Sequence, residues 1–265
     1  MRRCAVNPTP PVQVELRDRV RLVRLAKGAN ALDLEVLAEL DATLASLQGE
    51  GAPAIVITSA HPSVFCPGLD LKRLDGQSRA AVGEVMRRFN ALLVRLVSYP
   101  GPTVAALTGH AIAGGCLLTL ACDRRVMVRS RARIGLSEIN LGIPVPAGAM
   151  AMLLALYPTR SVEQLVLEGD GFGGERAFEL GLVERTTEAE GVVEEAIRLA
   201  RHLASRPPAA FATAKQFLRH GLVRAMEERD AAELERFLDC WFAPDTQDRI
   251  GALVASMEGG SGGQR

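Results

Sequence analysis

Hydrophobic positions near the start of the chain change from a two-residue period to a helical one. Apolar residues alternate with polar ones over 12–16 and over 20–25, which predicts two strands joined by a turn near Asp18. Over 33–47 the apolar residues recur every three or four positions, as on one face of an amphipathic helix. The continuous apolar segment 54–58 then predicts a strand buried on both faces, as in a parallel sheet.

The same alternation of helices and buried strands continues through the middle of the chain. Helical periodicity over 78–98 precedes an apolar strand over 103–107. A short apolar helix over 114–121, a strand over 125–128 and a helix over 147–157 follow. Strands that alternate with helices in this way predict an α/β fold.

After residue 189 the pattern becomes almost purely helical. The predicted helices cover 189–204, 209–220, 224–240 and 246–257. The expected organisation is therefore a flexible leader over 1–11 and an α/β core over 12–188. A helical C-terminal region over 189–257 and a flexible glycine-rich tail over 258–265 follow.

Composition is that of an ordinary globular domain. The chain has 265 residues, of which 48% are hydrophobic and 23% are charged. Its 31 basic and 31 acidic residues give a formal net charge of zero. Nucleic acids and anionic membranes are attracted by an excess of Lys and Arg, so we expect neither as a partner.

The cysteines and histidines show no ligand or disulfide pattern. Five cysteines contain no C-x-x-C pair, and the four histidines lack metal-ligand spacing. We therefore expect no metal site and a reducing compartment. The prolines at the start interrupt any signal-peptide core, and no uncharged segment reaches the roughly 18 residues of a membrane span. These features predict a cytoplasmic protein.

Two glycine-containing turns are the first candidates for chemistry. The segments 65–71 and 109–116 each follow a buried strand, and the second opens an apolar helix. Open α/β sheets bind ligands at the carboxyl ends of their strands, where both segments are predicted to lie. Each turn alone is also explained as a tight connection that requires glycine. Together they could present two backbone N–H groups to one anion, the second reinforced by a helix N-terminus.

Glu138 is the other candidate, because it is the only charged residue in the largely apolar segment 134–144. Burial would raise the pKa of this carboxyl and make it a proton carrier near neutral pH. The alternative is a partly exposed glutamate that caps a turn. The local sequence leaves both readings open.

Four segments, in this order, resemble the motif set of the crotonase superfamily, which is also called the enoyl-CoA hydratase/isomerase family. They are Lys-Gly-Ala-Asn-Ala-Leu at 27–32, Val-Phe-Cys-Pro-Gly-Leu-Asp-Leu-Lys at 64–72, Ala-Gly-Gly-Cys at 113–116 with Ala-Cys-Asp at 121–123, and Gly-Leu-Ser-Glu-Ile-Asn-Leu-Gly at 135–142. The resemblance covers roughly residues 12 to 257. Within the superfamily the motifs are most similar to those of mitochondrial-type Δ3,Δ2-enoyl-CoA isomerases.

This resemblance implies a ββα spiral core with a helical C-terminal region that builds trimers or dimers of trimers. It implies an acyl-CoA substrate, with CoA as part of that substrate, and no prosthetic group. The thioester oxygen would be held by the backbone N–H groups of Leu69 and Gly114, the two turns already noted. Glu138 would be the catalytic acid or base.

The resemblance also assigns further residues to the binding site. The residues implied to bind the CoA moiety are Lys27, Ala29, Gly68, Asp70, Leu71 and Lys72. Lys27 and Lys72 are two of only three lysines in the chain, and a flexible ammonium suits a phosphate contact. The residues implied to line the substrate pocket are Pro67, Leu117 and Ser137.

One departure from the family pattern selects a reaction. Enoyl-CoA hydratases carry two glutamates that hold a water, and the position of the first is Leu117 here. Adding water requires coordinated proton transfers that one acid performs poorly. Moving a double bond from the 3-position to the 2-position requires one base, so we expect an enoyl-CoA isomerase with Glu138 as the proton shuttle.

Other activities remain compatible with the motifs. A hydratase-like enzyme, a thioester hydrolase or a decarboxylase of the same superfamily would share the N–H groups of Leu69 and Gly114. A noncatalytic acyl-CoA-binding or RNA-binding paralogue is the alternative of another class, although zero net charge disfavours RNA. Trp241 and Phe242 are candidates for the wall of the acyl pocket, with plain helix packing as the alternative. Lys215 and the turn 144–148 receive no role from the sequence.

Overall fold

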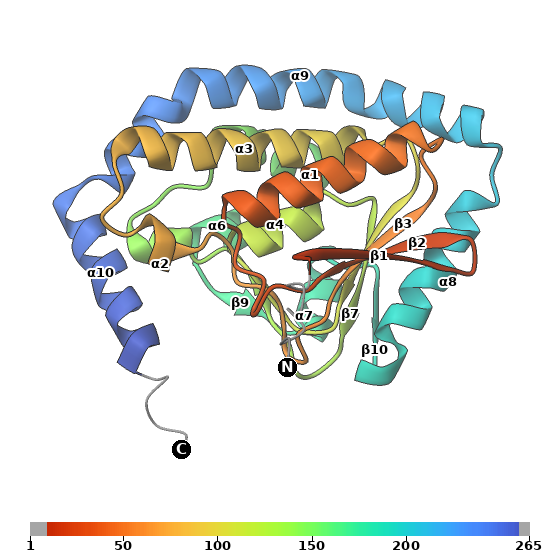
Figure 1. Ribbon diagram of the computed structural model, residues 1–265, viewed down its shortest axis with the longest axis horizontal. Coiled ribbons are helices and arrows are strands. Elements are labelled where there is room, and N and C mark those ends of the chain that lie inside the picture. Colours follow the sequence, from red (N-terminus) through yellow and green to blue (C-terminus); the bar gives the residue numbers. More distant parts are fainter. Residues whose placement is uncertain (1–9, 260–265) are drawn as a thin grey trace, which may run out of the picture.

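The larger of two β-sheets forms the base of the fold. In the computed structural model, which describes residues 10–259, this sheet has the strand order β1-β2-β3-β5-β7-β10 (Figure 1). Its strands are β1 (Val12–Arg17), β2 (Val20–Leu25), β3 (Ile55–Ser59), β5 (Thr103–Leu107), β7 (Arg124–Val128) and β10 (Arg185–Thr187). All neighbours are parallel except the hairpin β1–β2. The predicted hairpin is confirmed, and both residues of its turn, Asp18 and Arg19, have positive φ.

A second sheet of very short strands lies beside the first. It comprises β4 (Val64–Cys66), β6 (His110–Ile112), β8 (Ile134–Gly135) and β9 (Gly171–Phe172). The first three are parallel, and β9 is antiparallel to β8. The chain repeats one path three times: a strand in the large sheet (β3, β5 or β7) is followed by a strand in the small sheet (β4, β6 or β8), and then by a helix. This repeated ββα path confirms the α/β spiral that the sequence implied.

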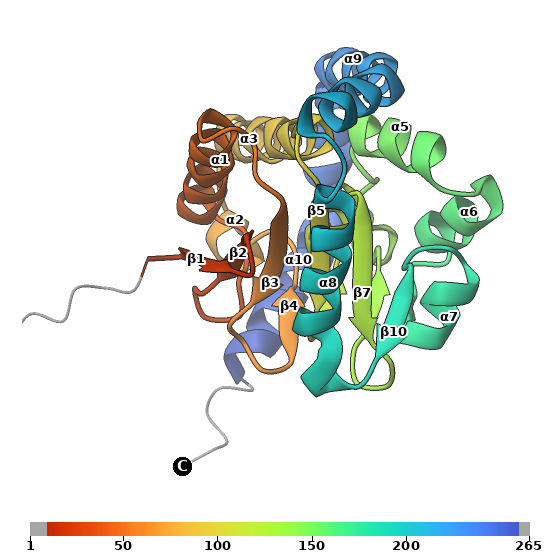
Figure 2. The ribbon, with the colours of Figure 1, turned by 90° about the vertical axis from the view of Figure 1, so that its right-hand side faces the viewer.

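Helices cover the sheets and extend beyond them. They are α1 (Leu34–Gly49), α2 (Leu71–Leu74), α3 (Arg79–Ser98), α4 (Gly114–Leu120), η1 (Glu138–Leu141), α5 (Ala147–Leu156), α6 (Thr159–Leu167), α7 (Gly174–Glu179), η2 (Ala189–Gly191), α8 (Val192–Ala204), α9 (Pro208–Trp241) and α10 (Pro244–Gly259). Figure 2 shows α8 across one face of the large sheet, where it contacts β3, β5 and β7. The long helix α9 lies along α3 (Figure 1) and also contacts α5 (Figure 2).

The helix boundaries require two corrections. The predicted helices 209–220 and 224–240 are one continuous helix, because Gly221 is tolerated where Lys215 before the expected break and Met226 after it are both buried. The helix α10 runs through Gly259, two residues into the expected tail. Residues 1–9 of the expected leader and 260–265 of the tail lie outside the described residues. Within 10–259, no helix combines the length and apolarity needed to cross a membrane.

Lys215, which the sequence left unexplained, fastens α9 to the large sheet. Its ammonium is buried and donates to Asp123 Oδ2 at 2.7 Å and to the Gly101 carbonyl at 3.0 Å. The same carboxylate oxygen accepts from the backbone N–H of Thr103 at 2.9 Å, at the start of β5. This buried ion pair, supported by hydrogen bonds to backbone groups at Gly101 and Thr103, fixes how α9 meets the large sheet.

Replacing one partner of this pair should be strongly destabilising. We expect Lys215→Met to lower the free energy of unfolding by about 3–5 kcal/mol, because Asp123 would remain buried without its counter-charge. Lys72→Met, on the surface, is the matched control and should change stability by less than about 0.5 kcal/mol. Urea denaturation followed by circular dichroism measures both, and a similar small change for the two variants would contradict the assignment.

Candidate active site

A largely apolar cavity of about 530 Å³ lies where the second sheet, α3 and the C-terminal helices meet. It gathers most of the site residues named from the sequence: Ala29, Pro67, Leu69, Asp70, Leu71, Lys72, Gly114, Leu117, Ser137 and Glu138. The first and last of these residues, Ala29 and Glu138, are 109 positions apart in the sequence. The fold therefore brings all four motif segments to one cavity. Lys27 and Gly68 are outside its lining.

The two candidate anion-binding turns come from neighbouring strands of the small sheet. Leu69 follows β4, and its neighbours pair with Leu32: Leu32 N–H donates to Gly68 O at 2.8 Å, and Asp70 N–H donates to Leu32 O at 3.1 Å. Because successive amides in an extended chain point in opposite directions, the N–H of Leu69 points away from Leu32. Gly114 is the first residue of α4, where backbone N–H groups have no partner within the helix.

Close backbone contact holds these two turns together. A Cβ built on Gly68, whose φ is +100°, would lie 3.0 Å from both the Cβ of Ala113 and the amide nitrogen of Gly114. Ala113 itself has φ +51°, a rare conformation for a residue with a Cβ, immediately before Gly114. This strained residue sets the direction of the Gly114 N–H. The pair of turns thus presents Leu69 and Gly114 to the same cavity, as an oxyanion hole requires.

Glu138 is the predicted acid–base group, and its carboxyl is partly enclosed by the fold. It begins η1, and its Oε2 atom is buried without a hydrogen-bond partner among the described residues. Burial raises the pKa of this carboxyl from its ordinary 4.5 to about 7, although hydrogen bonds from the backbone of Glu138 and Ser137 oppose the shift. Glu138 as a whole residue is partly exposed and its carboxyl accepts from the backbone of its own turn, as the turn-cap alternative expected, but its Oε2 atom is buried. A carboxyl that titrates near neutrality can both accept and return a proton.

The position of a second acid is occupied by a hydrocarbon. Leu117, on α4, is fully buried and contributes to the cavity wall. Among the described residues that line the cavity, Asp70 is the only other carboxylate, and its Oδ1 accepts from the Arg73 N–H as the N-cap of α2. Glu138 is thus the one carboxylate among the described lining residues that is not the N-cap of a helix.

The two lysines expected at the CoA phosphates have different surroundings. Lys72 is exposed and lies at the cavity lining beside Asp70. Lys27 instead donates to Asp33 Oδ2 at 2.6 Å and to Glu35 Oε2 at 2.5 Å, which offsets its positive charge. The structure therefore brings Lys72, and not Lys27, to the cavity.

Sequence reasoning found only part of the contribution of the helices to the far wall, because of its candidates Trp241 and Phe242 only Trp241 lines the cavity. Phe237 and Trp241 of α9 and Leu253 and Met257 of α10 line the cavity, with Met86 and Phe89 of α3. Trp241 is almost completely buried, so it combines helix packing with cavity lining. The other residues of this wall are apolar positions of predicted helices, and no local signal indicated that they face a cavity rather than the core.

The turn 144–148, also unexplained by sequence, is fixed by α9. The backbone N–H of Gly148 donates to Asp230 Oδ1 at 2.7 Å, and a Cβ on Gly148 would lie 2.2 Å from Asp230 Oδ2. Burial raises the pKa of Asp230 to about 6. This contact places the start of α5 so that Pro146 and Ile143 complete the cavity wall.

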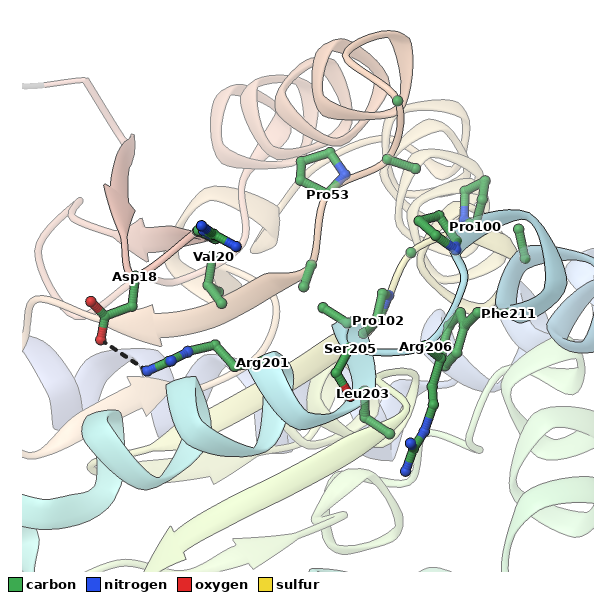
Figure 3. A pocket seen from close by; sticks show the side chains of 18 residues that line it. Asp18, Val20, Pro53, Pro100, Pro102, Arg201, Leu203, Ser205, Arg206 and Phe211 are labelled. Carbon is green, nitrogen blue, oxygen red and sulfur yellow. Dashed lines mark hydrogen bonds and ion pairs between the residues drawn. The ribbon is translucent and has the colours of Figure 1, made fainter.

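A larger cavity, of about 810 Å³, is a poor candidate for a catalytic centre. Figure 3 shows its wall, with the ion pair between Asp18 and Arg201. It includes Val20, Ala54 and Pro102, at or just before the amino ends of β2, β3 and β5. Its charged side chains, which also include Arg19 and Arg206, are exposed. Within residues 10–259, no group of three His, Cys, Asp or Glu side chains could hold a metal ion.

Comparison with known proteins identifies the family. The enoyl-CoA hydratase/isomerase family model matches residues 16–250. The chain therefore belongs to the enoyl-CoA hydratase/isomerase, or crotonase, family of acyl-CoA enzymes. This membership agrees with the ββα spiral and with the paired turns at Leu69 and Gly114.

Some of the similar proteins are named as hydratases and others as isomerases. The chain is 26% identical to the short-chain-enoyl-CoA hydratase of Clostridium acetobutylicum, over 92% of this chain and 94% of that protein. It is 32% identical to the human mitochondrial enoyl-CoA hydratase domain-containing protein 2, over 89% and 82% of the two chains. The crystal structure of human mitochondrial Δ3,Δ2-enoyl-CoA isomerase superposes with a TM-score of 0.90 at 26% identity, over 95% and 100%.

The burial of Glu138 should make stability depend on pH in a specific direction. Because the pKa of this carboxyl is raised on folding, its charged form destabilises the native state as pH rises from about 4.5 through 7. We expect the melting temperature of Glu138→Gln, relative to wild type, to increase between pH 5 and pH 8.5. Differential scanning calorimetry at both pH values measures this difference. Glu163→Gln, at an exposed position, is the control; equal behaviour of the two variants would contradict the burial of the charge.

Proposed function

We propose that the protein is an isomerase that moves the double bond of a 3-enoyl-CoA to the 2-position. The observation that carries this proposal is the single carboxylate of Glu138 in a cavity whose second acid position is Leu117. A double-bond shift needs one group that removes and returns a proton. Glu138, with a pKa of about 7, suits both steps.

The proposed reaction has two proton transfers. Glu138 removes a proton from C2, the C2–H electron pair enters the conjugated system, and negative charge develops on the thioester oxygen. The N–H groups of Leu69 and Gly114 stabilise that oxygen, an effect typically worth about 2.7–4 kcal/mol per donor. Glu138 then delivers the proton to C4 on the same face, and the C3=C4 bond becomes C2=C3. No atom is gained or lost.

The apolar wall also protects the intermediate. Leu117 and the other hydrocarbon side chains exclude water from the dienolate and keep the Glu138 pKa high. Lys72, at the cavity lining, is suited to a phosphate of the CoA moiety. Asp70 and Ser137 contact the same cavity and receive no proton-transfer step.

Hydration of a 2-enoyl-CoA is the second candidate, because relatives at 26–32% identity are named as hydratases. It requires an activated water as well as an acid. Leu117 offers no hydrogen bond to such a water, so isomerisation fits the cavity better.

A two-substrate assay distinguishes these reactions. With trans-3-hexenoyl-CoA we expect the ultraviolet absorbance of the conjugated enoyl thioester to grow, whereas crotonyl-CoA should retain it. Glu138→Gln should lose a factor of about 10²–10⁴ in kcat, because the amide cannot carry the proton. In wild type, kcat/KM should rise with pH around a midpoint near 7, as the free base form of Glu138 becomes populated.

Leu117→Ala is the matched control for this assay, since it alters the cavity wall but leaves the base. It should retain measurable isomerisation where Glu138→Gln does not. Rapid hydration of crotonyl-CoA by wild type would refute isomerase as the principal activity. Full activity of Glu138→Gln would refute the assigned base.

We also propose that the chain assembles as a homotrimer or a dimer of trimers, as the family resemblance implies. Two adjacent apolar side chains on α9, Phe217 and Leu218, are each 79% exposed in the single chain. Exposed apolar surface of this kind favours contact with another protein surface. A second copy of this chain is the occupant that the family resemblance supports.

Charge introduced at this position should weaken assembly. We expect the double variant Phe217→Glu/Leu218→Glu to elute as a monomer while wild type elutes at the mass of three or six chains. Size-exclusion chromatography with light scattering gives the masses, and far-ultraviolet circular dichroism checks that the variant is folded. A wild-type monomer would contradict the trimer, and an unchanged mass of the folded variant would exclude Phe217 and Leu218 from the interface.

A cytoplasmic location remains our proposal from the sequence. It is supported by the four cysteines of the described chain, Cys66, Cys116, Cys122 and Cys240, which are free thiols.

A further inference from the structure

The C-terminal helix α10 packs directly on η1, the short helix that begins with Glu138. Thr246, near the start of α10, is only 3% exposed and donates its hydroxyl to the Gly142 carbonyl at 3.4 Å. One turn later, Arg249 Nη1 donates to the Asn140 carbonyl at 3.3 Å. Two residues of α10 thus contact the backbone of the segment that carries the base.

Gly142 makes this contact unusually close. It ends η1 with φ +83°, and a Cβ built on it would lie 2.5 Å from Thr246 Oγ1. The turn at Gly142 is also tied to the base, because the next amide, Ile143 N–H, donates to the carbonyl of Glu138 at 3.0 Å. Any displacement of Gly142 relative to Thr246 is therefore passed to the backbone of Glu138.

The loop after α6 holds η1 as well. Asn140 Nδ2 donates to the Gly169 carbonyl at 2.9 Å, and a Cβ on Gly169 would lie 2.7 Å from Asn140 Oδ1. With η1 held at Asn140 in this way, the packing of α10 on Gly142 limits how far the rest of η1 can move. The same helix contributes Leu253 to the cavity that Glu138 enters.

We propose that Thr246 is a positioning residue for the reaction, which holds the η1 backbone so that the Glu138 carboxylate faces the reacting carbons. The inference rests on the proposed function of Glu138 as the proton carrier. Thr246 does not line the cavity, so it acts through η1 and not by contact with the substrate. The catalytic site is then completed by a helix that begins more than a hundred residues after the base (244 − 138 = 106).

Positioning predicts a specific kinetic signature. A misplaced base weakens proton transfer but leaves the CoA contacts and the Leu69 and Gly114 turns unchanged, so kcat should fall while KM stays nearly constant. Looser packing would also admit water to the Glu138 carboxyl and lower its apparent pKa. A residue with a merely structural role would reduce the amount of folded enzyme without altering KM or the pH midpoint of the remainder.

The first test compares three variants on α10 with 3-hexenoyl-CoA. We expect Thr246→Val to lower kcat about 10- to 100-fold, to change KM less than twofold and to move the pH midpoint of kcat/KM downward from about 7. Thr246→Ser retains the hydroxyl and should keep kcat within about threefold of wild type. Asp248→Ala, exposed on the same helix, is the control and should match wild type.

A second test remains informative if Thr246→Val folds poorly. In Gly142→Ala the new methyl would collide with Thr246 Oγ1, whereas in Gly142→Ala/Thr246→Ala that oxygen is absent and the next nearest Thr246 atom, Cβ, is 3.6 Å away. We expect the double variant to have a higher kcat than Gly142→Ala alone, a non-additivity that demonstrates coupling between the two positions. Additive losses would overturn the proposal.

The outcomes separate this inference from the proposed function. If Glu138→Gln is inactive and Thr246→Val has wild-type kcat and pH midpoint, the positioning role is wrong and the isomerase assignment stands. If Glu138→Gln is fully active, the assigned base is wrong whatever Thr246→Val does. A fall in kcat for Thr246→Val with rescue in Thr246→Ser supports the positioning role.

Discussion

The buried carboxylate of Glu138 is the constraint around which the cavity is organised. A carboxylate oxygen without a partner in an apolar environment is unfavourable when charged. This free-energy cost is the reason that the pKa of Glu138 is raised. The same cost makes the group useful, because a carboxyl with a pKa near neutrality exchanges protons readily. The surrounding structure must hold Glu138 in this environment, since a small movement toward water would restore an ordinary acid.

That support comes from parts of the chain that are distant in sequence. The paired turns at Gly68 and Gly114 require close backbone contact, and Lys215 and Asp123 fasten α9 to the large sheet. Asp230 of the same helix positions the start of α5. The apolar wall then receives Phe237 and Trp241 from α9, so one long helix connects the stability of the fold with the shape of the cavity.

The three lysines of the chain lie in three different electrostatic environments. The ammonium of Lys215 is buried and structural, that of Lys27 binds Asp33 and Glu35, and Lys72 lies at the cavity lining. Residue type alone does not distinguish these roles. The expectation that Lys27 and Lys72 act together at CoA phosphates is supported by the position of Lys72 only.

The sequence by itself determined the α/β class, the order of the main elements, the two glycine turns and the candidate Glu138, because periodicity, turn glycines and an isolated acid are local signals. The family resemblance then singled out Leu69 and Gly114 within those turns. The sequence pattern divided α9 wrongly at Gly221 and did not resolve the short strands of the second sheet individually, since strands of two or three residues carry too little periodicity. Only the tertiary structure decided that Leu117 and Trp241 face one cavity, that Lys215 meets Asp123, and that α10 packs on η1. These contacts join residues far apart in the chain, and their geometry depends on how helices and sheets pack together, which local pattern does not encode.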